Sequence, residues 1–473
     1  MKPAVKSAAT ARVLKALGIF GGVQVISILC SVVRTKLGAI WLGPAGVGIM
    51  AVYFSTMDML SQTAQLNIPQ SAVRDLSALR HEPSRASVLA AALRRFMLLL
   101  SGAGMVLVLL CSPLVSLAGF GDYSHTADFA LLSLWIVFAS TAAIEIAIMR
   151  ADDRLGAVAR TGICTSLTSI AAAVPLFYFF RLGGIVPALL AAYASNCLFA
   201  VLFRRRPEKT PRLTLRRIWV LSRGAVRLGI YMTVSSFVTL LASYVFIVYL
   251  NRAHSESAAG IYQAGYTLVN TYVGMIFTAI AMEYYPRLSR ACASVRRMEV
   301  IVSHEIKIAL WVLMPVAVAF ICCSGLIVRL LYSSEFEAAA PFVAIGACGV
   351  FFRAVSWCIA FTILARGDGR TYIITETLSS VAYLCLYIPL FDTFGYEGLG
   401  IGYVLWYGAY TAVCYIVYRY RYGMRLRRGI APLMWLSMAT GAAALALYYL
   451  AGPWWTAVLF LPPLGIMAMR RIK

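Results

Sequence analysis

Three charged side chains interrupt long apolar stretches of this sequence and are its first candidates for chemistry. Arg353, Asp58 and Glu376 each lie several residues inside a stretch long enough to cross a membrane. A charge at the centre of such a helix costs about 3 kcal/mol on insertion scales, so ionisable residues there are functional candidates. Because a guanidinium group suits phosphate oxygens, we predict that Arg353 binds an anionic headgroup. The alternative is a structural ion pair with Glu376 or another acid.

The two acids have two explanations of equal weight. Asp58 or Glu376 could carry a proton or a sodium ion in a coupled transport cycle. Pairing with an arginine in a cavity would explain either acid equally well. Ion coupling and pairing with an arginine therefore both stay open at these positions, and the sequence does not specify the ion.

Further basic and polar residues occupy related places along the chain. Arg34 and Lys36 follow the first apolar stretch, and Arg252 follows the corresponding stretch of the second half. Their similar places predict a basic rim to a substrate cavity, with ordinary loop charge as the alternative. Three amide side chains, in helices expected to border that cavity, could bond sugar hydroxyls or pack between helices: Gln24, Gln263 and Asn270.

Catalytic and cofactor chemistry is not indicated by the other residues. The four histidines lie in separate connections, which gives no metal cluster and no catalytic pair. The glycine-rich segments at 43–48 and 398–402 have no strand–turn–helix context, so a nucleotide loop is not expected. We therefore predict a protein that is not an enzyme and has no cofactor or metal, with a proton or sodium ion as the one candidate coupling partner.

The elements that must position these residues are membrane helices. Hydrophobic residues make up 61% of the 473 residues and charged residues 13%, which is far from the composition of soluble proteins. A membrane-spanning helix needs about 20 mostly apolar residues, and the chain contains fourteen such stretches. The predicted fold class is an all-α polytopic membrane protein of about 14 transmembrane helices.

The basic residues are distributed unevenly between the two sides of these spans. Of 42 Lys and Arg, 36 lie in alternate connections, five lie in the other connections, and Arg353 lies within a span. Cytoplasmic loops carry the excess of positive charge, so both termini are predicted to be cytoplasmic. Because the net charge of +23 is divided among many loops, no nucleic-acid partner is expected.

The chain also contains an internal repeat. Leu17-Gly-Ile-Phe resembles Leu228-Gly-Ile-Tyr, the segment 150–154 resembles 366–370, and 184–193 resembles 398–407, at offsets of about 211 to 216. Since six helices separate each pair, the two halves have the same orientation and their pseudo-twofold axis runs along the membrane normal. This predicts two parallel six-helix lobes around a central cavity, with four segments: 1–203, a basic cytoplasmic linker at 204–227, 228–418 and an additional helix pair at 431–469.

Two stretches of sequence resemble a known family. Arg34-Thr-Lys36 followed by Leu42-Gly-Pro-Ala-Gly-Val-Gly48, and Gly260-Ile-Tyr-Gln-Ala264 running to Ala281-Met-Glu-Tyr-Tyr-Pro-Arg-Leu-Ser289, are similar to bacterial O-antigen and polysaccharide translocases. These are lipid-linked oligosaccharide flippases of the multidrug/oligosaccharidyl-lipid/polysaccharide exporter superfamily. The resemblance covers about residues 10–420. It places Arg353 in the family's cationic cavity and Arg34 and Lys36 on its motif positions.

The resemblance implies a specific activity. It is the passage of an undecaprenyl-pyrophosphate-linked repeat unit of O-antigen or a related polysaccharide across the bacterial inner membrane, from the cytoplasmic to the periplasmic face, by alternating access. The implied partners are this lipid-linked oligosaccharide, membrane lipid, and a polysaccharide polymerase and glycosyltransferases. Two alternatives are a multidrug or cation antiporter of the same superfamily and a flippase for the peptidoglycan lipid precursor. The glycan and the oligomeric state stay open.

Overall fold

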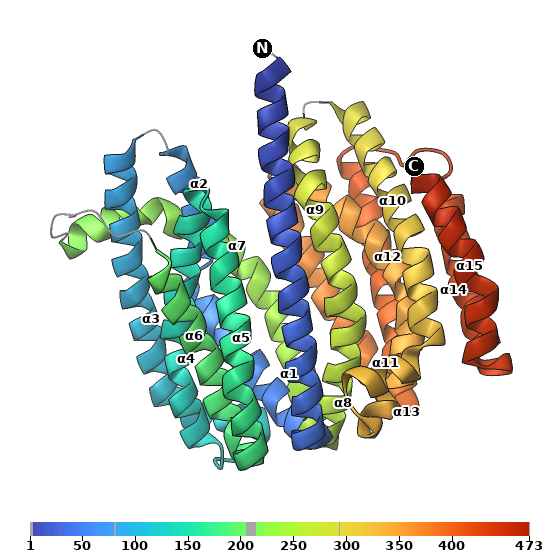
Figure 1. Ribbon diagram of the computed structural model, residues 1–473, viewed down its shortest axis with the longest axis horizontal. Coiled ribbons are helices and arrows are strands. Elements are labelled where there is room, and N and C mark those ends of the chain that lie inside the picture. The colour runs from blue at the N-terminus through green and yellow to red at the C-terminus, as the bar shows by residue number, and fades with distance from the viewer. Residues whose placement is uncertain (1–2, 80–81, 205–213, 293, 473) are drawn as a thin grey trace. The chain divides into compact units, whose positions relative to one another are not determined.

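The computed structural model describes residues 3–79, 82–204, 214–292 and 294–472, apart from the side chains of 3–28 and of scattered positions in α2, α7, α9 and α15. Every regular element in this part of the chain is helical (Figure 1). The long helices are α1 (Pro3–Gln65), α2 (Ile68–Ala78), α3 (Pro83–Phe120), α4 (Thr126–Ala151), α5 (Leu155–Phe180), α6 (Ile185–Leu202), α7 (Leu215–Tyr249), α8 (Glu256–Tyr266), α9 (Val273–Arg290), α10 (Val295–Cys322), α11 (Ser324–Leu331), α12 (Ala340–Ala365), α13 (Gly369–Ile416), α14 (Ile430–Ala451) and α15 (Pro453–Ile472). Short helical segments connect some of them: η1 (Arg181–Gly184), η2 (Leu250–His254), η3 (Thr267–Tyr272), η4 (Ser334–Ala339) and η5 (Val417–Arg421).

The all-α membrane fold that the sequence predicts is confirmed. In the described part of the chain, nine helices are long and apolar enough to cross a membrane by length and composition. A helix satisfies all of its backbone polar groups internally, which is what a hydrocarbon environment requires. Two of the nine segments, Leu155–Leu202 and Gly369–Arg421, each hold two of the predicted spans. The number of fourteen crossings therefore stays a prediction.

The chain divides into two compact units, Met1–Ala259 and Gly260–Lys473. The first unit has a core of aromatic and aliphatic side chains that includes Tyr53, Phe129 and Trp135. In the second unit, α12 is the central helix and packs against α10, α13 and α14. Most side chains of α12 are buried, so a charge placed on it lies in the interior of the unit. The predicted lobe boundaries differ from this division and stay a prediction.

Backbone irregularities recur 214 residues apart, once in each unit. Arg181 (φ 47°, ψ −121°) and Gly395 (φ 59°, ψ −135°) both break a helix with a positive φ. Three residues later, a Cβ on Gly184 would lie 2.2 Å from the carbonyl oxygen of Leu176, and a Cβ on Gly398 would lie 1.9 Å from that of Leu390. No side chain fits such a distance, so both glycines are required by the same close approach. These matched backbones support the internal repeat.

One of the predicted sequence matches shifts by two residues. The segments 150–154 and 366–370 align by charge at an offset of 216. In the structure, the turns match through Asp153 and Gly367, which both have a positive φ, and therefore at an offset of 214. The residue after each of them donates its N–H to a carbonyl five residues back, Met149 or Ile363. Backbone conformation, and not the spacing of arginines, defines this equivalence.

Candidate functional site

Arg353 lies in the middle of α12 and is surrounded by neutral groups of the second unit. Its Nη1 donates to the backbone carbonyl of Asn270 at 2.9 Å and to the hydroxyl of Tyr403 at 3.3 Å. The guanidinium carbon lies 5.1 Å from the ring centre of Phe277 and 5.7 Å from that of Tyr407. Cation–π contacts of this kind stabilise a charge that has lost part of its water.

An irregular helix supplies the carbonyl that Arg353 uses. Between α8 and α9 the chain forms the π-helical segment η3, which contains Asn270. π-Helical turns alter the regular hydrogen-bond pattern and are frequent at functional sites. The next turn carries Gly274, where a Cβ would lie 3.2 Å from Nη2 of Arg353. A small residue at this place therefore lets the guanidinium lie directly against the helix.

One edge of the guanidinium is available to a ligand. Arginine has five N–H donors, and among the described residues those on Nε and Nη2 of Arg353 have no acceptor. No described carboxylate forms an ion pair with it, and its side chain is only partly buried. The Nε–Nη2 edge is the fork that binds two oxygens of a phosphate or carboxylate at once. The donors and the geometry for binding an anion are therefore present at this edge.

The predicted alternative, an ion pair between Arg353 and Glu376, is wrong for this structure. The carboxylate of Glu376 accepts a hydrogen bond from the hydroxyl of Tyr410, 34 residues along the same helix α13. Helix α13 changes direction at Gly395, so its two halves pack side by side and bring these residues together. Glu376 is therefore held within α13 and does not compensate the charge of Arg353.

An aromatic cluster beside Arg353 escaped the sequence analysis. The hydroxyls of Tyr262 and Tyr383 are hydrogen-bonded at 2.8 Å, and the indole of Trp406 donates to the carbonyl of Ser379 at 2.9 Å. The cluster consists of Tyr262, Tyr383, Tyr387, Tyr403, Trp406 and Tyr407. Its signal was the three- and four-residue spacing of aromatic residues along α13, which places them on one helix face.

The family of the chain follows from its sequence. Residues 25–341 match the family model described as "Polysaccharide biosynthesis protein". The chain belongs to this family. The match confirms the resemblance to polysaccharide translocases. No curated protein sequence matches the chain.

Solved structures of transporters share the fold of this polysaccharide biosynthesis protein. The chain is similar to "Lipid II flippase MurJ, inward closed conformation", with 14% identity, a TM-score of 0.66, and coverage of 96% of this chain and 97% of that one. It is similar to an inward-facing multidrug resistance MATE family transporter of the MOP superfamily, with 16% identity, a TM-score of 0.66, and coverage of 86% and 95%. A MOP superfamily transporter from Pyrococcus furiosus, described by a "reverse polarity of binding pocket", has 16% identity, a TM-score of 0.59, and coverage of 89% and 96%. The chain is therefore a multi-pass membrane protein with the MOP transporter fold.

The first unit of this family member brings two predicted site residues near one tyrosine. Tyr193 is within electrostatic range of both Asp58 and Arg34, and its ring stacks on Trp135 with 3.7 Å between centroids. The carboxylate of Asp58 accepts a hydrogen bond from Gln62 at 2.9 Å. Tyr193 lies 214 residues before Tyr407, the ring beside Arg353, and so occupies the equivalent place in the first unit.

The other predicted residues have separate surroundings. Arg34 is exposed and Lys36 partly buried, both on the first half of α1 before its break at Gly43. Arg252 is exposed in η2, where its Nε would lie 3.3 Å from a Cβ on Gly121. Gln263 donates to the hydroxyl of Thr267 at 3.4 Å. Asn270 contributes its backbone carbonyl to Arg353, whereas the side chain of Gln24 and linker residues 205–213 lie outside the described part.

Proposed function

We propose that this protein is a flippase for an undecaprenyl-pyrophosphate-linked oligosaccharide. It would move the repeat unit of O-antigen or a related surface polysaccharide from the cytoplasmic to the periplasmic face of the bacterial inner membrane by alternating access. The observation that carries the proposal is the open Nε–Nη2 edge of Arg353 in the interior of an apolar unit. A pyrophosphate presents the paired oxygens that this edge binds.

The surroundings of Arg353 fit the rest of such a substrate. Tyrosine and tryptophan rings offer flat apolar faces and polar edges, which suit a sugar ring with its hydroxyls. Moving the headgroup along a polar surface avoids exposing its hydrogen-bonding groups to hydrocarbon, which would cost several kcal/mol for each unsatisfied group. Family membership supports the polysaccharide class of the substrate. In this proposal the protein catalyses no covalent reaction and cooperates with glycosyltransferases and a polysaccharide polymerase.

Transport by the purified protein would test the proposal against its two alternatives. In liposomes, we expect undecaprenyl-pyrophosphate-linked oligosaccharide to cross the bilayer at a rate that depends on the protein. The peptidoglycan lipid precursor and an organic cation should be transported much more slowly. Loss of a fluorescent sugar label to an external enzyme or quencher measures the crossing. Preferred transport of the organic cation would contradict an anion site and favour the antiporter.

Coupling to an ion gradient is proposed for Asp58 and Glu376. The carboxylate of Asp58 has a side-chain partner in Gln62, and that of Glu376 has one in Tyr410, so an amide could replace either acid. If one of them binds the coupling ion, Asp58→Asn or Glu376→Gln should make transport independent of an imposed proton or sodium gradient while substrate binding persists. Each variant is assayed in liposomes with and without the gradient. An unchanged response to both gradients in both variants would show that the acids are structural.

A further inference from the structure

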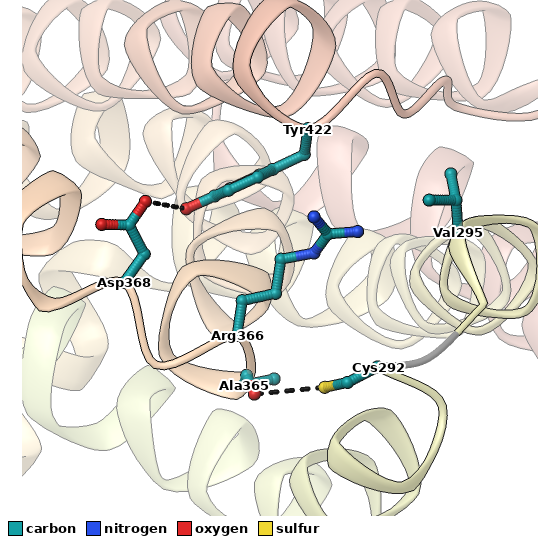
Figure 2. A pocket seen from close by; sticks show the side chains of 6 residues that line it. All are labelled: Cys292, Val295, Ala365, Arg366, Asp368 and Tyr422. Atoms are coloured by element: carbon teal, nitrogen blue, oxygen red, sulfur yellow. Dashed lines mark hydrogen bonds between the residues drawn. The ribbon is translucent and has the colours of Figure 1, made fainter.

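A second basic pocket lies at one end of the second unit, away from Arg353. It is a cavity of about 490 Å³ lined by Cys292, Val295, Ala365, Arg366, Asp368 and Tyr422 (Figure 2). These residues lie in, or directly next to, the connections α9–α10, α12–α13 and α13–α14. The distribution of basic residues places all three connections on the cytoplasmic side, and the structure brings them to one pocket. Arg366 caps the end of α12 thirteen positions after Arg353, a rise of about 20 Å.

The guanidinium of Arg366 has no acid to compensate it among the described residues. Its Nε is fully buried and has no hydrogen-bond partner. The guanidinium carbon lies 4.7 Å from the ring centre of Tyr422, and Figure 2 shows the side chain extending past this ring into the space toward Val295. Buried polar groups are nearly always hydrogen-bonded in native proteins. An unused donor on a charged group inside a pocket therefore indicates a missing acceptor.

The one carboxylate of the pocket is engaged elsewhere. Asp368 accepts hydrogen bonds from Arg421 at 2.8 Å, from the hydroxyl of Tyr422 at 3.0 Å, and from the N–H and hydroxyl of Thr371 at 3.2 and 2.8 Å. Burial raises the pKa of Asp368, but the hydrogen bonds from Arg421 and its other donors outweigh burial and hold the pKa well below its usual range. Asp368 is thus ionised and paired with Arg421. Asp368 therefore does not neutralise the positive charge of Arg366.

A helix terminus adds to the positive potential of the pocket. Val295, which lines the cavity, is the first residue of the 28-residue helix α10. The Ser294 side chain accepts the N–H of Arg297, whereas the earlier N–H groups of a helix have no acceptor within it. Unbonded N–H groups and the helix dipole make such a terminus favourable for an anion.

The equivalent turn of the first unit shows that the fold does not require this arginine. At the offset of 214, Asp152 takes the place of Arg366, and the two residues donate equivalent N–H bonds, to Ile148 and Thr362. The same backbone thus forms with the opposite charge. The turn therefore does not explain why this position carries an arginine. A bound anion would explain it.

We propose that this pocket binds a phosphate group, held by the guanidinium of Arg366 and the N-terminus of α10. The phosphate could belong to the headgroup of an anionic phospholipid or to a soluble phosphate. Either would supply acceptors for the terminal nitrogens of Arg366, which Figure 2 shows directed into this space. The inference is independent of the substrate proposed for Arg353.

Protection of Cys292 from alkylation would test this proposal, because its thiol lines the same cavity. The full-length protein is labelled with N-ethylmaleimide, and modification of Cys292 is followed by peptide mass spectrometry. One arm adds inorganic phosphate at constant ionic strength, with chloride as the balancing ion. The other arm compares nanodiscs of phosphatidylcholine with and without phosphatidylglycerol. At a concentration about ten times Kd, labelling of the wild type should slow about tenfold, because only about a tenth of the sites are then empty.

Variants of neighbouring arginines separate a site from general charge attraction. Arg366→Ala, or the planar neutral Arg366→Gln if the alanine variant does not fold, should lose the protection. Arg370→Ala removes an exposed charge four residues further on, in the first turn of α13, and should keep the protection. Protection by phosphate, by phosphatidylglycerol or by both supports the site if the Arg366 variants lose that protection. The arm that protects shows whether the phosphate group belongs to a soluble ion or to a lipid. Protection by neither in the wild type, or equal protection in the Arg366 variants, would overturn the proposal.

Discussion

Replacing Arg353 with alanine is expected to abolish export of the surface polysaccharide while the protein stays folded and inserted. The variant removes the open Nε–Nη2 edge that we propose binds the pyrophosphate. No described carboxylate pairs with Arg353, so its removal strands no opposite charge. Lipid-linked precursor should accumulate in the cytoplasmic leaflet. Surface glycan, precursor and protein abundance are measured in the same cells.

Two further variants give this experiment its controls. Arg353→Lys retains the charge but loses the planar fork, so partial export is expected. Arg329→Ala removes an arginine of the same unit that is exposed and paired with Glu337 at 2.7 Å, and it should export normally. Normal export by an abundant Arg353→Ala protein would show that the anion site is not needed.

Replacing Arg94 with alanine is expected to destabilise the first unit strongly. Its Nε and Nη2 bind the two carboxylate oxygens of Glu145 at 2.7 and 2.9 Å, and the Glu145 side chain is only 3% exposed. Removing one partner of a buried pair leaves an uncompensated charge and costs about 3–5 kcal/mol. Arg204 lies 3.6 Å from the same carboxylate and offsets part of this cost, so we expect the lower end of the range. Thermal unfolding of the purified protein measures the effect.

The neighbouring arginine and a double variant test the cause. Arg95→Ala removes a partly exposed charge from the next position and should change stability by less than about 0.5 kcal/mol. Replacing both Arg94 and Glu145 with leucine removes the buried charges together and should recover most of the lost stability. If Arg94→Ala unfolds at the same temperature as the wild type, the ion pair is not structural.

The sequence alone predicted the properties that depend on local composition. Apolar stretches of about 20 residues specify membrane helices without reference to their neighbours, and the described chain is helical throughout its regular elements. Motifs such as Gly43-Pro-Ala-Gly-Val-Gly48 predicted the family, and the family match confirms that prediction. Arg353 was identified as a candidate because a charged residue within an apolar stretch can be recognised from the sequence alone. Its predicted role as a substrate site stays a prediction.

The tertiary structure decided which residues meet. Arg353 donates to a carbonyl 83 positions away and does not form the alternative ion pair with Glu376. Glu376 instead accepts a hydrogen bond from Tyr410 across the bend at Gly395. The pocket around Arg366 joins three connections that share no motif in the sequence. Contacts of this kind depend on where helices bend and on which helix faces pack together. Small differences in packing free energy over the whole unit determine the bends and the packed faces. A local pattern of residue types shows that a buried charge will cost free energy. It does not show which residue will be its partner.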